Sequence, residues 1–177
     1  MPRFASNKIA KAFHRGDNAA TTTEKGNALE ELLAYLFHKI PGVLLHEKNA
    51  RDAQGSEEID LVFWNERNSN GLPFLDNVLL FECKNWVAPV NGQSVVYFLN
   101  KLQTRHLQFG FLIAANGITG NQDDRTAAFQ HIGNALIQSN IKLIVLDRNE
   151  LCALTHSDQL IRLIQKKITN ITLRALL

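Results

Sequence analysis

Two charged side chains lie two residues apart in a short and strongly apolar segment. Residues 78–84 read Val-Leu-Leu-Phe-Glu-Cys-Lys, which is typical of a buried β-strand. Side chains at this spacing project from one face of a strand, so Glu82 and Lys84 share a face and Phe81 and Cys83 share the other. Burial of an unpaired charge is costly. The pattern therefore indicates either a functional site or a partly exposed ion pair near a sheet edge.

A third charge, Asp60, interrupts the preceding apolar segment, in a strand expected over residues 57–64. The connection, residues 65–77, is rich in Asn, Ser, Gly and Pro, which predicts a hairpin with a long loop. In such a hairpin Asp60 and Glu82 converge. Two converging carboxylates suit a hard cation such as Mg²⁺, which can polarise a phosphodiester and activate water. Lys84 could orient that water or help to deprotonate it, and could stabilise charge growing on the phosphate.

A fourth candidate, Glu30, lies on the first firmly indicated helix. Apolar residues recur at helical spacing over residues 29–40, and a Pro-Gly pair ends the pattern. Glu30 lies at the margin of this apolar stripe, whereas Glu31 is rotated further toward solvent. Glu30 can then reach the same site, directly or through water; the alternative is an ordinary carboxylate on the helix surface. Glu58 shares a strand face with Asp60 and is an additional candidate.

The elements that must position these residues follow from the periodicity of apolar side chains. After the first helix we expect strands near 43–47, 57–64 and 78–84, a helix at 91–108, a strand at 109–115, a helix within 123–139, a strand at 141–147 and a helix from about 157 to 168. A meander followed by strand–helix–strand crossovers predicts the α/β class, with a mixed sheet of about five strands flanked by helices.

Length and composition set broader limits. With 45% hydrophobic and 20% charged residues the chain resembles an ordinary globular protein. No apolar run is long enough to span a bilayer, so a cytoplasmic location is expected. No linker divides the chain, which predicts one domain, residues 23–177, after a basic segment, residues 1–22. The formal net charge is only +2. The basic residues near both ends could contact a phosphate backbone or simply be solvated.

Together these residues resemble a known signature. Glu30 on a first helix, followed by Glu58-Ile59-Asp60 and Phe81-Glu82-Cys83-Lys84, is similar to the PD-(D/E)XK nuclease motif, with Ile59 in place of the nominal proline. The order helix, three strands, helix, strand also resembles the restriction-endonuclease-like core of that superfamily. Residues 26–30, 110–113 and 146–151 are most similar to Mrr-type restriction endonuclease domains, and the resemblance covers about residues 23–151.

This resemblance implies a function and a role for each residue. Asp60 and Glu82 would be metal ligands, Lys84 the catalytic lysine, and Glu30 a supporting acid that also takes part in metal binding. The chain would be a Mg²⁺-dependent endodeoxyribonuclease of the restriction or repair type, with Mn²⁺ as a substitute ion and DNA as its partner. Cutting both strands with one site per chain commonly calls for a dimer, so a homodimer is expected by analogy.

The helix expected after the motif adds supporting residues. A polar stripe opposite its apolar face consists of Gln93, Tyr97, Lys101 and Arg105. In the resembling nucleases this helix lies near the active site, which implies support from Gln93 and phosphate contacts from Lys101 and Arg105. The alternative for the two basic residues is a solvated helix face. Asn85 and Trp86 directly follow the motif and are expected to line the cleft, with Asn85 as a nucleic-acid contact.

Two other functions compete with the nuclease hypothesis. One is a catalytically inert, nuclease-like module that binds DNA or another partner; the complete motif argues against it. The other is an unrelated α/β enzyme in which the charged strand pair is incidental. Metal binding that depends on Asp60 and Glu82 would separate the nuclease from the inert module, and carboxylates that lie far apart would favour the unrelated enzyme.

Overall fold

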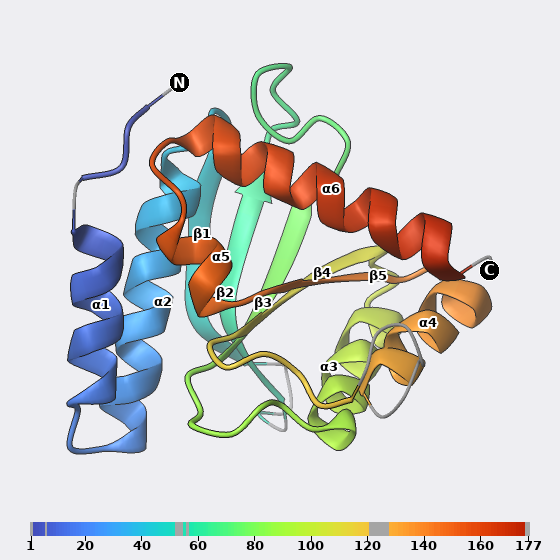
Figure 1. Cartoon of the computed structure of the whole chain (residues 1–177). Helices are drawn as coiled ribbons and strands as arrows, with labels where there is room; N and C mark the ends of the chain where they lie inside the picture. The colour runs from blue at the N-terminus through green and yellow to red at the C-terminus, as the bar shows by residue number, and fades with distance from the viewer. Residues whose placement is uncertain (1, 6, 52–54, 56, 121–127, 176–177) are drawn as a thin grey trace.

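A five-stranded sheet forms the centre of the computed structural model, which describes residues 2–5, 7–51, 55, 57–120 and 128–175 (Figure 1). The strands are β1 (Val43–Arg51), β2 (Glu58–Asn65), β3 (Val78–Lys84), β4 (Phe109–Ala114) and β5 (Lys142–Leu146). They lie in the order β1-β2-β3-β4-β5, with β1, β2 and β3 antiparallel and β3, β4 and β5 parallel. The predicted α/β class and the mixed sheet flanked by helices are confirmed.

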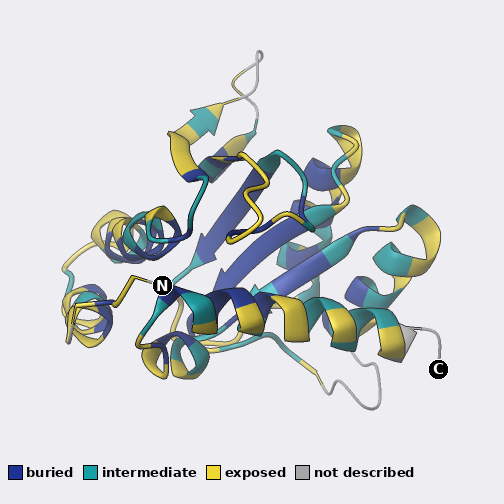
Figure 2. Cartoon of the chain, turned by 90° about the horizontal axis from the view of Figure 1, so that it is seen from above, coloured by how far each residue is buried: buried dark blue, intermediate teal, exposed yellow. Residues whose placement is uncertain are grey.

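Helices cover both faces of this sheet. They are α1 (Lys8–Asp17), α2 (Thr22–His38), α3 (Gly92–Thr104), α4 (Ala128–Ser139), α5 (Arg148–Cys152) and α6 (Ser157–Ala175). Apolar side chains of α2 and α6 pack on one face of the sheet, and those of α3 and α4 pack on the other. In Figure 2 the middle of the sheet is buried between these layers, whereas most of β1 is exposed. None of the described helices is long and apolar enough to cross a bilayer.

An aromatic cluster fixes the orientation of β3. The rings of Phe81 and Phe111 are stacked with centroids 4.4 Å apart, and Phe37 of α2 meets the Phe81 ring edge-on at 4.7 Å. Phe81 and Cys83 therefore point toward α2. By alternation along the strand, Leu80 and Glu82 face the opposite layer, which contains α3. The packing of the aromatic face thus decides which helix meets the charged face.

The ends of several elements differ from the sequence predictions. The strand predicted to end near residue 47 extends to Arg51, because β1 pairs with β2 along its whole length, with a bulge between Leu45 and Glu47. The last helix extends to Ala175 instead of about residue 168. Part of the helix predicted within 123–139 lies outside the described residues, and the structure describes it from Ala128. The start of α2 is as predicted, since Thr21 and Glu24 form a capping box.

The N-terminal segment packs onto the rest of the chain. Helix α1 lies along the outer side of α2 (Figure 1), and Phe4, Ile9 and Phe13 are buried in the core that α2 shares with the sheet. The backbone N–H of Phe4 donates to the carbonyl of Thr155, which joins the start of the chain to the turn before α6. The exposed side of α1 carries basic residues, while its apolar side stabilises the fold.

Candidate active site

The site lies where the pairing of β2 with β3 ends. The antiparallel register runs from Trp64 opposite Val78 to Leu61 opposite Phe81. Just beyond this pair, the backbone N–H of Cys83, two residues after Phe81, donates to Oδ2 of Asp60 at 2.6 Å. A side-chain carboxylate thus takes over where the backbone ladder stops. The predicted hairpin is confirmed, and it places Asp60 against β3 beside Glu82.

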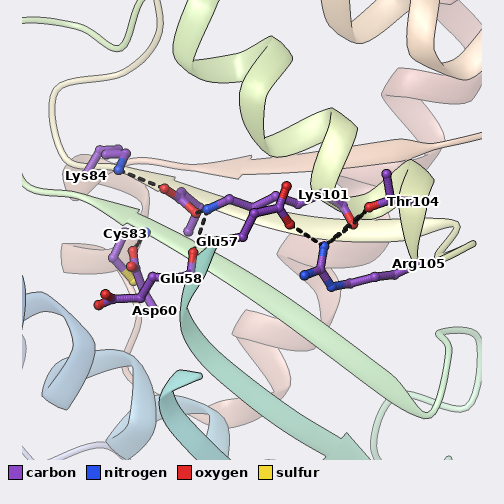
Figure 3. A network of polar contacts seen from close by, with 9 residues as sticks. Glu57, Glu58, Asp60, Cys83, Lys84, Lys101, Thr104 and Arg105 are labelled. Atoms are coloured by element: carbon purple, nitrogen blue, oxygen red, sulfur yellow. Dashed lines mark hydrogen bonds and ion pairs between the residues drawn. The ribbon is translucent and has the colours of Figure 1, made fainter. Parts of the chain in front are cut away.

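Both oxygens of the Glu82 carboxylate are held by lysines. Glu82 is buried on β3, with Oε1 2.8 Å from Nζ of Lys84 and Oε2 2.9 Å from Nζ of Lys101. Figure 3 shows Lys84 approaching from the strand and Lys101 approaching from α3. Glu82 and Lys84 therefore do form an ion pair, in which Glu82 is buried and Lys84 is partly exposed, but it lies on the central strand of the sheet and not at its edge.

Lys101 was expected on a solvent-facing stripe, and this prediction is wrong. The residue is buried, and its Nζ also donates to the backbone carbonyl of Glu58 at 2.6 Å. The reason is that the sheet face beneath α3 carries Glu82, so the helix position beside the apolar stripe meets a carboxylate where water was assumed. Arg105 is half-buried and pairs with Glu57 at 2.8 Å (Figure 3). Both basic side chains are thus engaged by acids of the chain itself.

The acids of the site influence one another. The pKa of Asp60 is raised to about 6, first by burial and then by the negative charge of Glu82; Glu30 raises it further, whereas the Cys83 N–H and Lys84 oppose the rise. Glu30 is buried on α2, as its place beside the apolar stripe predicted, and burial raises its pKa too. The three carboxylates therefore gather near the end of the β2–β3 pairing, where their charges repel.

Lys84 is held in its charged form by these acids. Burial alone would lower its pKa, but the charge and hydrogen bond of Glu82, together with the charge of Asp60, outweigh burial and raise it. A lysine whose pKa is raised stays protonated near neutral pH and therefore cannot accept a proton from water. Lys84 is therefore suited to orient a ligand and to stabilise negative charge.

The remaining candidates lie around this cluster. Asn85 donates from Nδ2 to the carbonyl of Lys25 at 3.1 Å, which ties the residue after the motif to the first turn of α2. Trp86 is exposed, and Nζ of Lys84 lies 5.3 Å from its ring centroid. Gln93 is exposed on the first turn of α3. Glu58 contributes its backbone carbonyl to Lys101, while its carboxylate points outward to Arg51 at 3.2 Å.

The donor set fits a hard divalent cation, although it is not fully assembled. Within the described ranges, no three His, Cys, Asp or Glu side chains are arranged as a ready-made metal site. Mg²⁺, however, is commonly held by one or two carboxylates together with waters and substrate phosphates. Asp60 and Glu82 supply two such carboxylates, and a cation between them would relieve the repulsion that raises the pKa of Asp60. Glu82 would first have to release a lysine.

Sequence reasoning missed the role of α3 in this cluster. A signal was present: Lys101 is three residues after Phe98 and directly before Leu102, two side chains buried on α3. A lysine next to a buried stripe points to an acidic partner in the layer below.

Comparison with known proteins adds no family assignment: no protein-family model matches the chain, and no curated protein matches its sequence.

Proposed function

We propose that this chain is a metal-dependent endonuclease that hydrolyses DNA phosphodiester bonds, built on a restriction-endonuclease-like PD-(D/E)XK core. The observation that carries the proposal is the gathering of Glu30, Asp60 and Glu82 with Lys84 where β2 and β3 stop pairing. The element order α2, β1, β2, β3, α3, β4 supports it as well, since it agrees with the order expected for that core.

Each residue has a role that follows from its surroundings. Asp60 and Glu82 would hold the cation, which when bound supplies Lewis-acid polarisation of the scissile phosphate. Asp60, with a pKa of about 6, is ionised at neutral pH and able to bind it. Lys84 stays an ammonium, so it would orient the attacking water and stabilise charge on the phosphate. Glu30, on α2, would help to hold the attacking water in place.

The direct test is cleavage of plasmid and linear DNA in the presence of Mg²⁺, Mn²⁺ or EDTA. We expect cleavage with either ion, none with EDTA, and loss of cleavage in Lys84→Ala and Asp60→Asn. Gln138→Ala is a suitable control, because Gln138 is an uncharged residue exposed on α4. A wild-type protein that never cleaves, or cleavage that survives Lys84→Ala, would refute the proposal.

One observation favours a second function, a nuclease-like module that binds nucleic acid without cutting it. Both Glu82 oxygens form ion pairs with lysines in the structure. If neither ion pair opens, Glu82 has no oxygen free for a cation and the chain cannot cleave DNA. Calorimetric titration with Mg²⁺ separates the two functions. A nuclease should bind the ion in a manner that depends on Asp60 and Glu82, whereas a permanently locked module should not.

A further inference from the structure

The two lysines that hold Glu82 differ in their access to water. The side chain of Lys84 is 23% exposed, whereas that of Lys101 is only 3% exposed. Each contacts a different oxygen of the same carboxylate. An ammonium that leaves Glu82 must find other partners or water, so the two positions are unequal in how readily the lysine can exchange.

Lys101 has a complete set of partners inside the protein. Its Nζ lies 2.9 Å from Oε2 of Glu82, 2.6 Å from the carbonyl oxygen of Glu58 and 4.6 Å from the ring centroid of Tyr97. These contacts come from β3, from β2 and from α3 itself. Breaking a buried pair of this kind leaves an uncompensated charge on both sides. Lys101 is thus fixed in place by the fold.

Lys84 is less enclosed than Lys101. It is partly exposed at the C-terminal end of β3, and the exposed Trp86 ring lies 5.3 Å from its Nζ. A lysine here can swing toward solvent or the aromatic face without losing all its stabilisation. Of the two Glu82 oxygens, Oε1 is therefore the one that can be vacated.

We propose that Lys101 is a positioning residue: from inside the protein it pins Oε2 of Glu82, so that Oε1 exchanges Lys84 for a divalent cation. This inference rests on the proposed function and adds a division of labour between the lysines. Lys101 acts through Glu82 and does not touch the substrate. Lys84, released from Glu82, becomes available to the phosphate.

A simpler explanation is that both lysines only neutralise Glu82. Removing either positive charge would then tighten cation binding, because each lysine repels the ion. The positioning role predicts that the two substitutions change the affinity for Mg²⁺ in opposite directions. Loss of Lys84 removes a competitor, whereas loss of Lys101 leaves the carboxylate free to rotate away from the site, and partners that orient a metal ligand are commonly worth 10–100-fold in affinity or activity.

The experiment compares Lys84→Met and Lys101→Met with Lys166→Met as the exposed control, using calorimetric titration with Mg²⁺ and no DNA. We expect Lys84→Met to bind Mg²⁺ as tightly as the wild type or more tightly, and Lys101→Met to bind it about 10-fold more weakly or worse. Mg²⁺ binding by Lys101→Met that equals or exceeds that of the wild type would overturn the inference.

A metal-free measurement separates this inference from the proposed function. Urea unfolding in EDTA of Lys101→Met, Glu82→Gln and the double variant gives the coupling between the two residues. We expect their combined effect on the unfolding equilibrium to depart from additivity by about 10-fold or more. If Lys101→Met alone does not fold, the double variant should, because it leaves no unpaired buried carboxylate. Additive effects would overturn the positioning role, whereas absent Mg²⁺ binding and cleavage in the wild type would overturn the proposed function.

Discussion

Replacing Asp60 with Asn should stabilise the protein at neutral pH while abolishing its proposed activity. The carboxyl of Asp60 has a pKa of about 6 in the folded chain and an ordinary value of 3.8. Between these values the unfolded chain has released a proton that the folded chain retains, so stability falls as the pH rises from about 4 to above 6. A difference of about two pKa units corresponds to at most about 3 kcal/mol. Asn carries no charge and escapes this cost.

The substitution also preserves the local hydrogen bond. Oδ2 of Asp60 accepts the N–H of Cys83 at 2.6 Å, and the amide oxygen of Asn can accept the same donor. Asp60→Ala removes both the charge and the acceptor, which leaves the Cys83 N–H without that partner. Asp60→Ala is therefore the matched control, and it should be less stable than Asp60→Asn by about 1–3 kcal/mol.

Urea unfolding from pH 4 to pH 8 in EDTA is the appropriate assay. The stability gained by Asp60→Asn should be near zero at pH 4 and reach a plateau of about 1–3 kcal/mol above pH 7. In buffer without EDTA at pH 7, free Mg²⁺ at tenfold its dissociation constant should stabilise the wild type by about 1.4 kcal/mol and leave the Asn variant unchanged. If the stability gained by Asp60→Asn does not depend on pH, or if the variant is less stable than the wild type at pH 8, the charge of Asp60 does not destabilise the folded chain.

Three further changes test other parts of the structure. Lys84→Ala should reduce DNA cleavage by about 100-fold or more with a native circular dichroism spectrum; equal cleavage would remove Lys84 from the mechanism. In Gly16→Ala the new Cβ would lie 2.4 Å from Nδ2 of Asn85, so Asn85 must move. Stability should change by less than about 1 kcal/mol, because helix propensity favours Ala, while cleavage falls; unchanged cleavage would show that the position of Asn85 does not matter. Removal of residues 1–20 keeps the Thr21 cap but deletes three buried side chains, Phe4, Ile9 and Phe13. At about 1.5–3 kcal/mol each, their loss should lower the urea midpoint strongly, and an unchanged midpoint would contradict the packing of α1.

The sequence was sufficient to predict the strand pairing and the position of Asp60. Strands β2 and β3 are short apolar runs joined by a loop of turn-forming residues, and alternation within each strand then decides which side chains meet. Glu30 could be placed for a similar reason, since helical spacing puts it at the edge of a buried stripe. These predictions depend on local periodicity, which the fold preserves.

The partner of Lys101 could not be predicted in the same way. Helical periodicity divides α3 into an apolar face and a polar face. A prediction from periodicity then assumes that the polar face contacts water. Whether a polar position meets water or a carboxylate depends on how α3 crosses the sheet, and the packing of Phe81 and Phe111 on the far face sets the direction of Glu82. This is a property of tertiary packing: residues 91–108 alone show that Lys101 lies next to the apolar stripe, but they do not show which acid it meets.

The balance of charge in the site favours a ligand of positive charge. Three acids, Glu30, Asp60 and Glu82, gather near two lysines, and the pKa of Asp60 is raised first by burial and then by the charges of Glu82 and Glu30, which Lys84 opposes. A cluster with no further purpose would gain stability by losing one carboxylate. Retaining all three carboxylates is consistent with the proposal that a cation binds among them. The stability of the Asp60→Asn variant measures what the Asp60 charge costs the folded chain. The Mg²⁺ affinity of the Lys101→Met variant measures how far the surrounding lysines prepare Glu82 for a cation.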